Sequence, residues 1–136
     1  MNKNFDIIRT IGAITRTIQM DSNQRFRELG LNNNLYIYII RVCEEPEMFL
    51  GQLTDAVQID RTRSFQAVKK LIKLRFFELS SDATNQKIKR IFPTKKALDM
   101  YPQLHAYELK HSNYLLSDLS IEEEKQLALL LSRLKY

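Results

Sequence analysis

A chain of 136 residues, 44% of them hydrophobic and 27% charged, has the size and composition of one folded domain, which excludes a disordered or fibrous protein. With only three glycines and three prolines, long helices with short connections are expected. The sequence has no run of 18 apolar residues, no start typical of a secretion signal and a single cysteine. We therefore expect a cytoplasmic protein that does not associate with a membrane.

The net charge of +5 is unevenly distributed along the chain. Residues 61–96 contain eleven lysines or arginines and two acidic residues, a local net charge of +9, whereas the rest of the chain carries −4. Such a concentrated positive segment favours a nucleic acid as partner, because neutralised phosphates release condensed counterions and this adds affinity. Charge alone leaves open the alternative of a basic surface that only faces solvent.

The spacing of apolar residues in the first part of the chain is helical. They recur at every third or fourth position over residues 5–29, which predicts a long helix that Gly30 ends in the left-handed conformation. The asparagine cluster 32–34 is expected to cap a second helix over about residues 35–43, because an Asn side chain can accept a bond from first-turn amides. Pro46 marks its end.

Two further helices follow in the basic part of the chain. Residues 50–57 form a short amphipathic stretch, and Asp60 is a suitable N-cap for a helix over residues 61–74. The buried stripe of this last helix is predicted to consist of Phe65, Val68, Leu71 and Ile72.

The pattern then changes from helical spacing to alternation. Residues 77–81 and 87–93 alternate in polarity around the polar cluster 82–86, which predicts a β-hairpin. Thr94 is expected to cap a helix that continues, bent, through Pro102. The final helix should begin at a capping box of Ser120 and Glu123 and carry the leucines Leu127, Leu130, Leu131 and Leu134.

A short helix, a turn, a basic helix and a basic hairpin together form the layout of a winged helix-turn-helix, a mainly α fold with a β-hairpin wing. In such a protein the second helix enters the major groove of DNA and the hairpin reaches the backbone or the minor groove. Arg can bond guanine, Gln can bond adenine, and lysines farther along the helix suit phosphates. The candidate DNA-binding residues are Arg61, Thr62, Arg63, Ser64, Gln66, Lys69, Lys70 and Lys73 on the helix and Lys87, Lys89 and Arg90 on the hairpin.

Three segments of the chain resemble the MarR family of bacterial transcriptional regulators: LGQLTDAVQIDRTRSFQAVKKLIKLRFFEL, SSDATNQKIKRIFPTKKALDMYP and LSIEEEKQLALLLSRL. The resemblance implies a homodimer formed by about residues 1–34 and 97–136, with a DNA-binding lobe over about residues 35–96, all within the single domain 1–136. It also implies a pseudo-palindromic operator on double-stranded DNA. A repressor whose affinity changes with a small-molecule effector or another signal is expected.

The sequence departs from the family's pattern at two positions. Gln86 stands where an arginine of the wing is expected, so either Lys87 or Arg90 takes its place or the wing binds DNA more weakly. Ala97 stands where the family usually has a glycine in the following helix.

Alternatives remain for residues outside the basic segment. His105, Glu108 and His111 lie at three-residue steps, so a metal-responsive regulator is conceivable, although six-residue spacing turns the two imidazoles apart. A second alternative is a protein-interaction module that uses the same fold to bind a protein partner instead of DNA. Cys43 is expected to be structural, because its acidic neighbours would raise the pKa of the thiol.

The sequence carries no signature of an enzyme. It has no glycine-rich phosphate loop, nucleophile elbow or metal-ligand motif, so neither catalysis nor a cofactor is expected. A pocket for a small molecule between the dimer helices and the DNA-binding lobe is expected to draw on the aromatic residues Phe5, Tyr36, Tyr38, Tyr101, Tyr107 and Tyr114.

Overall fold

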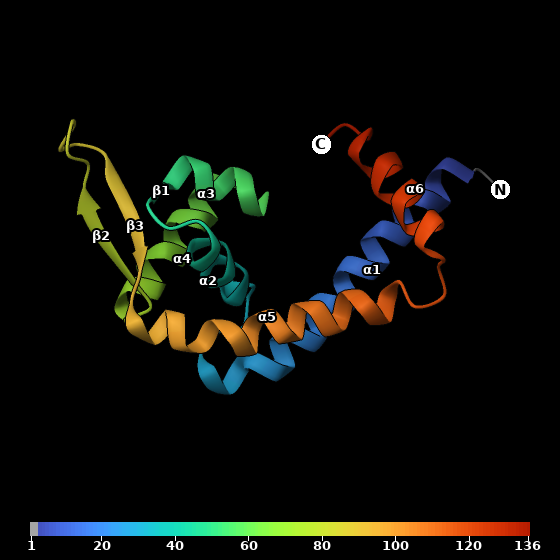
Figure 1. Ribbon diagram of the computed structural model, residues 1–136, viewed down its shortest axis with the longest axis horizontal. Helices are drawn as coiled ribbons and strands as arrows, with labels where there is room; N and C mark the ends of the chain where they lie inside the picture. Colours follow the sequence, from blue (N-terminus) through green and yellow to red (C-terminus); the bar gives the residue numbers. More distant parts are fainter. Residues whose placement is uncertain (1–2) are drawn as a thin grey trace. The chain divides into compact units, whose positions relative to one another are not determined.

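The computed structural model describes residues 3–136 (Figure 1). Met1 and Asn2, which the predicted segment 1–34 includes, lie outside the described residues. The helices are α1 (Lys3–Phe26), the short 3-10 helix η1 (Arg27–Leu29), α2 (Leu35–Glu44), α3 (Leu50–Val57), α4 (Arg61–Lys73), α5 (Lys95–Leu115) and α6 (Ile121–Ser132). The strands are β1 (Met48–Phe49), β2 (Phe77–Ser81) and β3 (Lys89–Pro93). The chain divides into two compact units, one ending at Leu104 and the other starting at His105.

The predicted mainly α fold with a β-hairpin wing is confirmed. The hairpin pairs β2 with β3 in antiparallel register, with Leu79 opposite Ile91. A third strand, β1, which was not among the predicted elements, pairs with the other edge of β3 and gives the sheet order β1-β3-β2. A strand of two residues is too short for its side chains to show an alternating pattern.

The core of the first unit forms around α2. Six of the ten residues of this helix are buried, and it packs against α3, α4 and β3. The partners bring their own fully buried side chains to this core, among them Leu53 of α3, Leu71 of α4 and Ile91 of β3. The apolar stripes of the basic segment therefore hold α3, α4 and the wing on a common support.

The chain reversals between α1 and α2 depend on left-handed residues. Gly30 has φ 73° after η1, which confirms the predicted helix end. The predicted side-chain cap of α2 is wrong: Asn34 is itself left-handed, with φ 66°, and its side chain makes no capping bond. Instead, the amide of Asn33 donates to Asn23 Oδ1 at 2.8 Å. Asparagine tolerates the left-handed conformation better than most residues, so the cluster forms a turn rather than a cap.

The two C-terminal helices begin as the sequence predicts. The Thr94 hydroxyl accepts a bond from the amide of Ala97 at 3.3 Å, and α5 continues through Pro102. At the start of α6 the amide of Glu123 donates to Ser120 Oγ at 3.1 Å, and the amide of Ser120 donates to Glu123 Oε1 at 2.9 Å. The predicted capping box is therefore confirmed.

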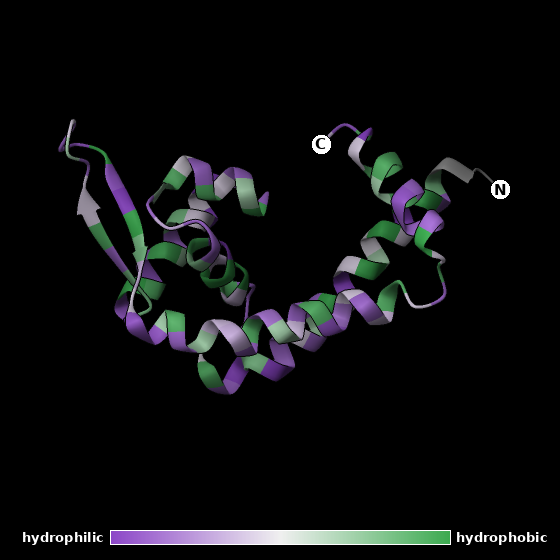
Figure 2. Cartoon of the chain, in the orientation of Figure 1, coloured by the Kyte–Doolittle hydropathy of each residue, from purple (hydrophilic) through white to green (hydrophobic). Residues whose placement is uncertain are grey.

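Large apolar side chains stay exposed on α1 and on α6, and Figure 2 shows the apolar positions of both helices in green. Those of α1 are Phe5, Ile7, Ile8, Ile14 and Met20, and those of α6 are Ile121, Leu127, Leu129, Leu130 and Leu131. Exposed apolar surface of this extent is typical of interaction sites. Within residues 3–136, no helix is both long and apolar enough to cross a membrane.

Replacing Leu71 by Ala tests the attachment of α4 to the core. Because Leu71 is fully buried, the cavity left behind should lower the free energy of unfolding by about 2–5 kcal/mol. Phe65→Ala is the control on the same helix. Because this side chain is 52% exposed, its truncation should lower the free energy of unfolding by less than about 1 kcal/mol. Urea titrations at one protein concentration measure both values, and equal losses would contradict this orientation of α4.

Candidate nucleic-acid interface

Helix α4 presents one face to the core and the opposite face to solvent. Its buried residues are Ser64, Ala67, Val68 and Leu71, which share one side of a helix because they lie three, four and seven positions apart. All the other residues of its first ten are exposed: Arg61, Thr62, Arg63, Phe65, Gln66, Lys69 and Lys70, and Lys73 is exposed as well. The predicted DNA-binding residues of the helix thus share the solvent side, with one exception.

That exception is Ser64, whose predicted contact with DNA is wrong. The side chain is fully buried, its hydroxyl donates to the carbonyl of Ile59 at 3.2 Å, and it lies 3.1 Å from the Tyr38 hydroxyl. Burial raises the pKa of Tyr38, so the phenol keeps its proton and can donate to Ser64 Oγ. Ser64 therefore fixes α4 against α2 instead of facing a ligand.

The predicted positions of Phe65 and Ser64 on α4 are reversed in the structure. Phe65 was predicted to be in the buried stripe, but it is 52% exposed and lies on the solvent side. The small residues Ser64 and Ala67 allow α4 to approach the core closely, and Val68 and Leu71 complete the buried column. The buried residues lie three, four and seven positions after Ser64, so their helical spacing is visible in the sequence. A polar serine, however, is not expected in the core, and this is why the spacing did not predict the buried face.

The first turn of α4 is held by Asp60. Its carboxylate accepts a bond from the amide of Arg63 at 2.9 Å, which confirms the predicted N-cap. The Arg63 side chain returns to the same carboxylate, with Nε 3.4 Å from Oδ2, and is still 80% exposed. Asp60 therefore fixes the start of the helix and also orients one of its arginines.

The exposed face of α4 is strongly positive. The helix contains no acidic residue. Within the described part of the chain, residues 3–136, Arg61, Lys69, Lys70 and Lys73 form no ion pair. These side chains are free to neutralise the phosphates of a polyanion.

In the wing, Arg90 holds the hairpin together. Its Nε donates to Asp82 Oδ1 at 2.7 Å, its Nη1 donates to the carbonyl of Glu47 at 3.0 Å, and the guanidinium lies 4.3 Å from the centre of the Phe49 ring. Asp82 also accepts bonds from the hydroxyl and amide of Thr84. Hydrogen bonds from Thr84 and Arg90 lower the pKa of Asp82 to about 2.

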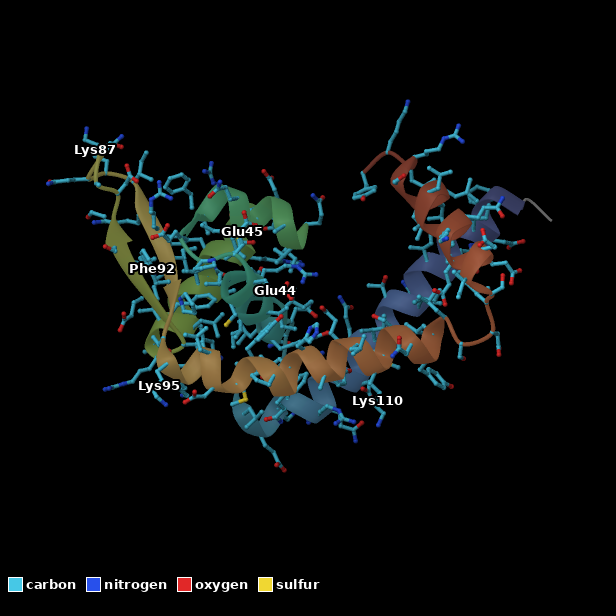
Figure 3. All side chains as sticks on the ribbon, in the orientation of Figure 1. Glu44, Glu45, Lys87, Phe92, Lys95 and Lys110 are labelled. Atoms are coloured by element: carbon cyan, nitrogen blue, oxygen red, sulfur yellow. The ribbon has the colours of Figure 1, made fainter. Side chains whose placement is uncertain are left out.

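These bonds assign Arg90 a structural role and disfavour the alternative in which it replaces the missing arginine at Gln86. Lys89 is exposed and its Nζ donates to Ser81 Oγ at 2.7 Å. Lys87 is also exposed and lies at the far end of the hairpin (Figure 3). Lys87 is therefore the better candidate for a contact from the wing tip.

A polar groove lies beside α4 in the first unit. It has a volume of about 760 Å³ and is lined by the ends of α1 and α2, the turn before α4, and the residues Arg63, Gln66 and Lys70 of α4 itself. Of the six aromatic residues predicted to line a pocket, Tyr38 lines this groove and Tyr36 lines a smaller adjoining cavity of about 280 Å³. The groove thus shares side chains with the positive face.

The remaining candidates form no second site. Among residues 3–136 no three histidine, cysteine, aspartate or glutamate side chains gather in a way that could hold a metal ion, and this includes His105, Glu108 and His111. Burial and the neighbouring Glu44 raise the pKa of the half-buried Cys43 thiol to about 11, so the reactive thiolate is scarce at neutral pH.

Comparison with known proteins gives the family. The chain is 35% identical over 130 residues to the HTH-type transcriptional regulator YybA of Bacillus subtilis (strain 168), an alignment that spans 96% of this chain and 87% of the relative. The chain belongs to the MarR/SlyA family of transcriptional regulators. No protein-family model matches the sequence.

Solved structures of this family have the same fold. The transcriptional regulator SlyA superposes with a TM-score of 0.90 at 38% identity over 94% of this chain and 90% of that one. A MarR family regulator from Listeria monocytogenes, crystallised with a 26mer DNA, superposes with a TM-score of 0.88 at 31% identity, over 93% of this chain and 84% of that one. These relatives are all transcriptional regulators.

The ion pair in the wing predicts a distinctive dependence of stability on pH. The pKa of Asp82 falls from 3.8 to about 2 on folding, so its ionised form stabilises the wing above pH 3.8 and that stabilisation declines as the pH falls towards 2. Asp82→Asn should therefore lower the melting temperature at pH 7. The difference in melting temperature between this variant and the unmodified protein should become smaller below pH 4, where Asp82 itself becomes protonated. Asp55→Asn, at an exposed residue, is the control. If the difference in melting temperature caused by Asp82→Asn were the same at every pH, the proposed role of the ionised Asp82 would be contradicted.

Proposed function

We propose that this regulator binds double-stranded DNA sequence-specifically as a homodimer and represses transcription from a pseudo-palindromic operator. The observation that carries the proposal is the exposed face of α4, which has no acidic residue and is rich in lysines and arginines, of which only Arg63 has an ion-pair partner among residues 3–136. A relative that is 31% identical was crystallised with DNA, which supports the same partner here.

In this proposal α4 enters the major groove. Arg61, Thr62 and Gln66 lie in its first half, where they can reach base edges: Arg to guanine, Gln to adenine, and Thr to several groups. The lysines of the outer face, Lys69, Lys70 and Lys73, would neutralise phosphates and so contribute affinity more than specificity. Arg63 is exposed beside them, and the wing would add Lys87 and Lys89.

The homodimer supplies the symmetry of the site. The apolar side chains that stay exposed on α1 and α6 favour a second copy as the partner of the segments 1–34 and 97–136. Two recognition helices presented by a two-fold axis would fit successive major grooves about 34–36 Å apart. This spacing is what makes a pseudo-palindrome the expected operator.

A small-molecule effector would act through the groove beside α4. Because Arg63, Gln66 and Lys70 line both the groove and the positive face, a bound molecule would compete for side chains that DNA also needs. Such a ligand shifts the population between DNA-binding and released states only by its differential affinity for them. The arrangement favours relief of repression over activation.

The salt dependence of binding tests the electrostatic part of the proposal. Log–log plots of affinity against salt concentration should be steep, and Lys73→Ala should reduce the slope by about 0.9 while weakening operator and random DNA alike. Lys110→Ala, on an exposed lysine of the second unit, is the matched control (Figure 3). A flat plot would indicate that the basic face is only solvated and would favour the protein-interaction module.

Base readout is tested by substitutions in the first half of α4. Gln66→Ala or Arg61→Ala should cost about 1–3 kcal/mol on the operator and relax the preference at one base pair per half-site. Competition assays with every single-base variant of the operator measure the preference at each position. Unchanged preferences in both variants would rule out these residues as the readers of the sequence.

A further inference from the structure

The side chain of Phe65 is exposed in an unusual place. It is 52% exposed on a helix whose buried residues are Ser64, Ala67, Val68 and Leu71. An exposed phenylalanine leaves a large apolar ring in contact with water, and covering that ring on binding would contribute favourable free energy. The ring of Phe65 is therefore accessible to a binding partner at the proposed DNA interface.

The neighbours of Phe65 restrict what this occupant can be. Arg61 precedes it by four positions and Lys69 follows it by four, so both lie on the same side of the helix. The Nζ of Lys69 is 5.4 Å from the centre of the Phe65 ring. An apolar contact flanked by two cations matches a partner that offers an apolar group between phosphates.

Duplex DNA offers such a group in the major groove. Each base pair presents hydrogen-bond donors and acceptors there, and the C5-methyl group of thymine is the apolar element among them, for which phenylalanine is a suitable contact. Phe65 lies in the first half of α4, one position before Gln66 and three after Thr62. The ring is thus carried on the same turns as the side chains proposed to read bases.

We propose that Phe65 is a specificity-determining residue that contacts the methyl group of a thymine in each half-site. The inference rests on the proposed function and adds to it the identity of one base. Arg61 and Gln66 can discriminate only through hydrogen bonds, so Phe65 adds an apolar contact with the methyl group that these two residues do not provide.

Replacing thymine by deoxyuridine tests this contact, because the exchange removes the methyl group and leaves every hydrogen-bonding group in place. The probe is a duplex with the sequence that the protein enriches from a random pool, carrying deoxyuridine at one thymine of each half-site in turn. At one such position the unmodified protein should lose about four-fold in affinity per half-site, the effect of one buried methyl-sized group. Phe65→Ala should bind the thymine probe more weakly and be insensitive to the exchange.

Phe65→Leu is the conservative control, since it keeps an apolar side chain and should retain part of the sensitivity. Thermal melts of all three proteins verify that the variants are folded. If the unmodified protein binds its sequence but is indifferent to deoxyuridine at every thymine, the inference fails and the proposed function stands. If Phe65→Ala keeps the full sensitivity, another residue contacts the methyl group and the inference also fails. If no sequence is enriched at all, the proposed function fails, and the inference falls with it.

Discussion

The packing of α4 on α2 is the constraint on which the rest of the site depends. Ser64, Ala67, Val68 and Leu71 bury one side of α4, and the pairing of Ser64 with the Tyr38 hydroxyl sets its rotation. A rotation of one residue, about 100° around the helix axis, would place different side chains outside. The identity of the exposed residues is therefore decided by contacts in the core and not by the charged residues themselves.

Two acidic residues close to the basic segment, Asp60 and Asp82, are paired within the structure. Asp60 caps α4, and Asp82 pairs with Arg90 at 2.7 Å to close the wing. Neither carboxylate opposes the lysines of α4. The local excess of positive charge in the sequence thus becomes a surface that can meet phosphates, and Asp60 and Asp82 do not reduce it because each already has a partner.

Much of this could be predicted from local patterns. The bounds of α3, the Asp60 cap, the Gly30 helix end and the capping box of Ser120 all depend on residues close in sequence. The errors on α4 concern tertiary contacts: Ser64 becomes buried because Tyr38 and a carbonyl satisfy its hydroxyl, and Phe65 is left outside. In the same way, the sequence alone predicts that Arg90 is a surface cation. In the folded protein its guanidinium contacts Glu47, Phe49 and Asp82, which are brought together by the tertiary structure.

Selection of bound DNA from a random pool tests the central claim most directly, because it examines DNA binding, symmetry and half-site spacing in one measurement. If two copies of α4 meet successive major grooves, the enriched sequence should be a two-fold symmetric motif with half-site centres about 10 base pairs apart. A pool that remains random after repeated rounds, or an enriched motif without two-fold symmetry, would contradict the account.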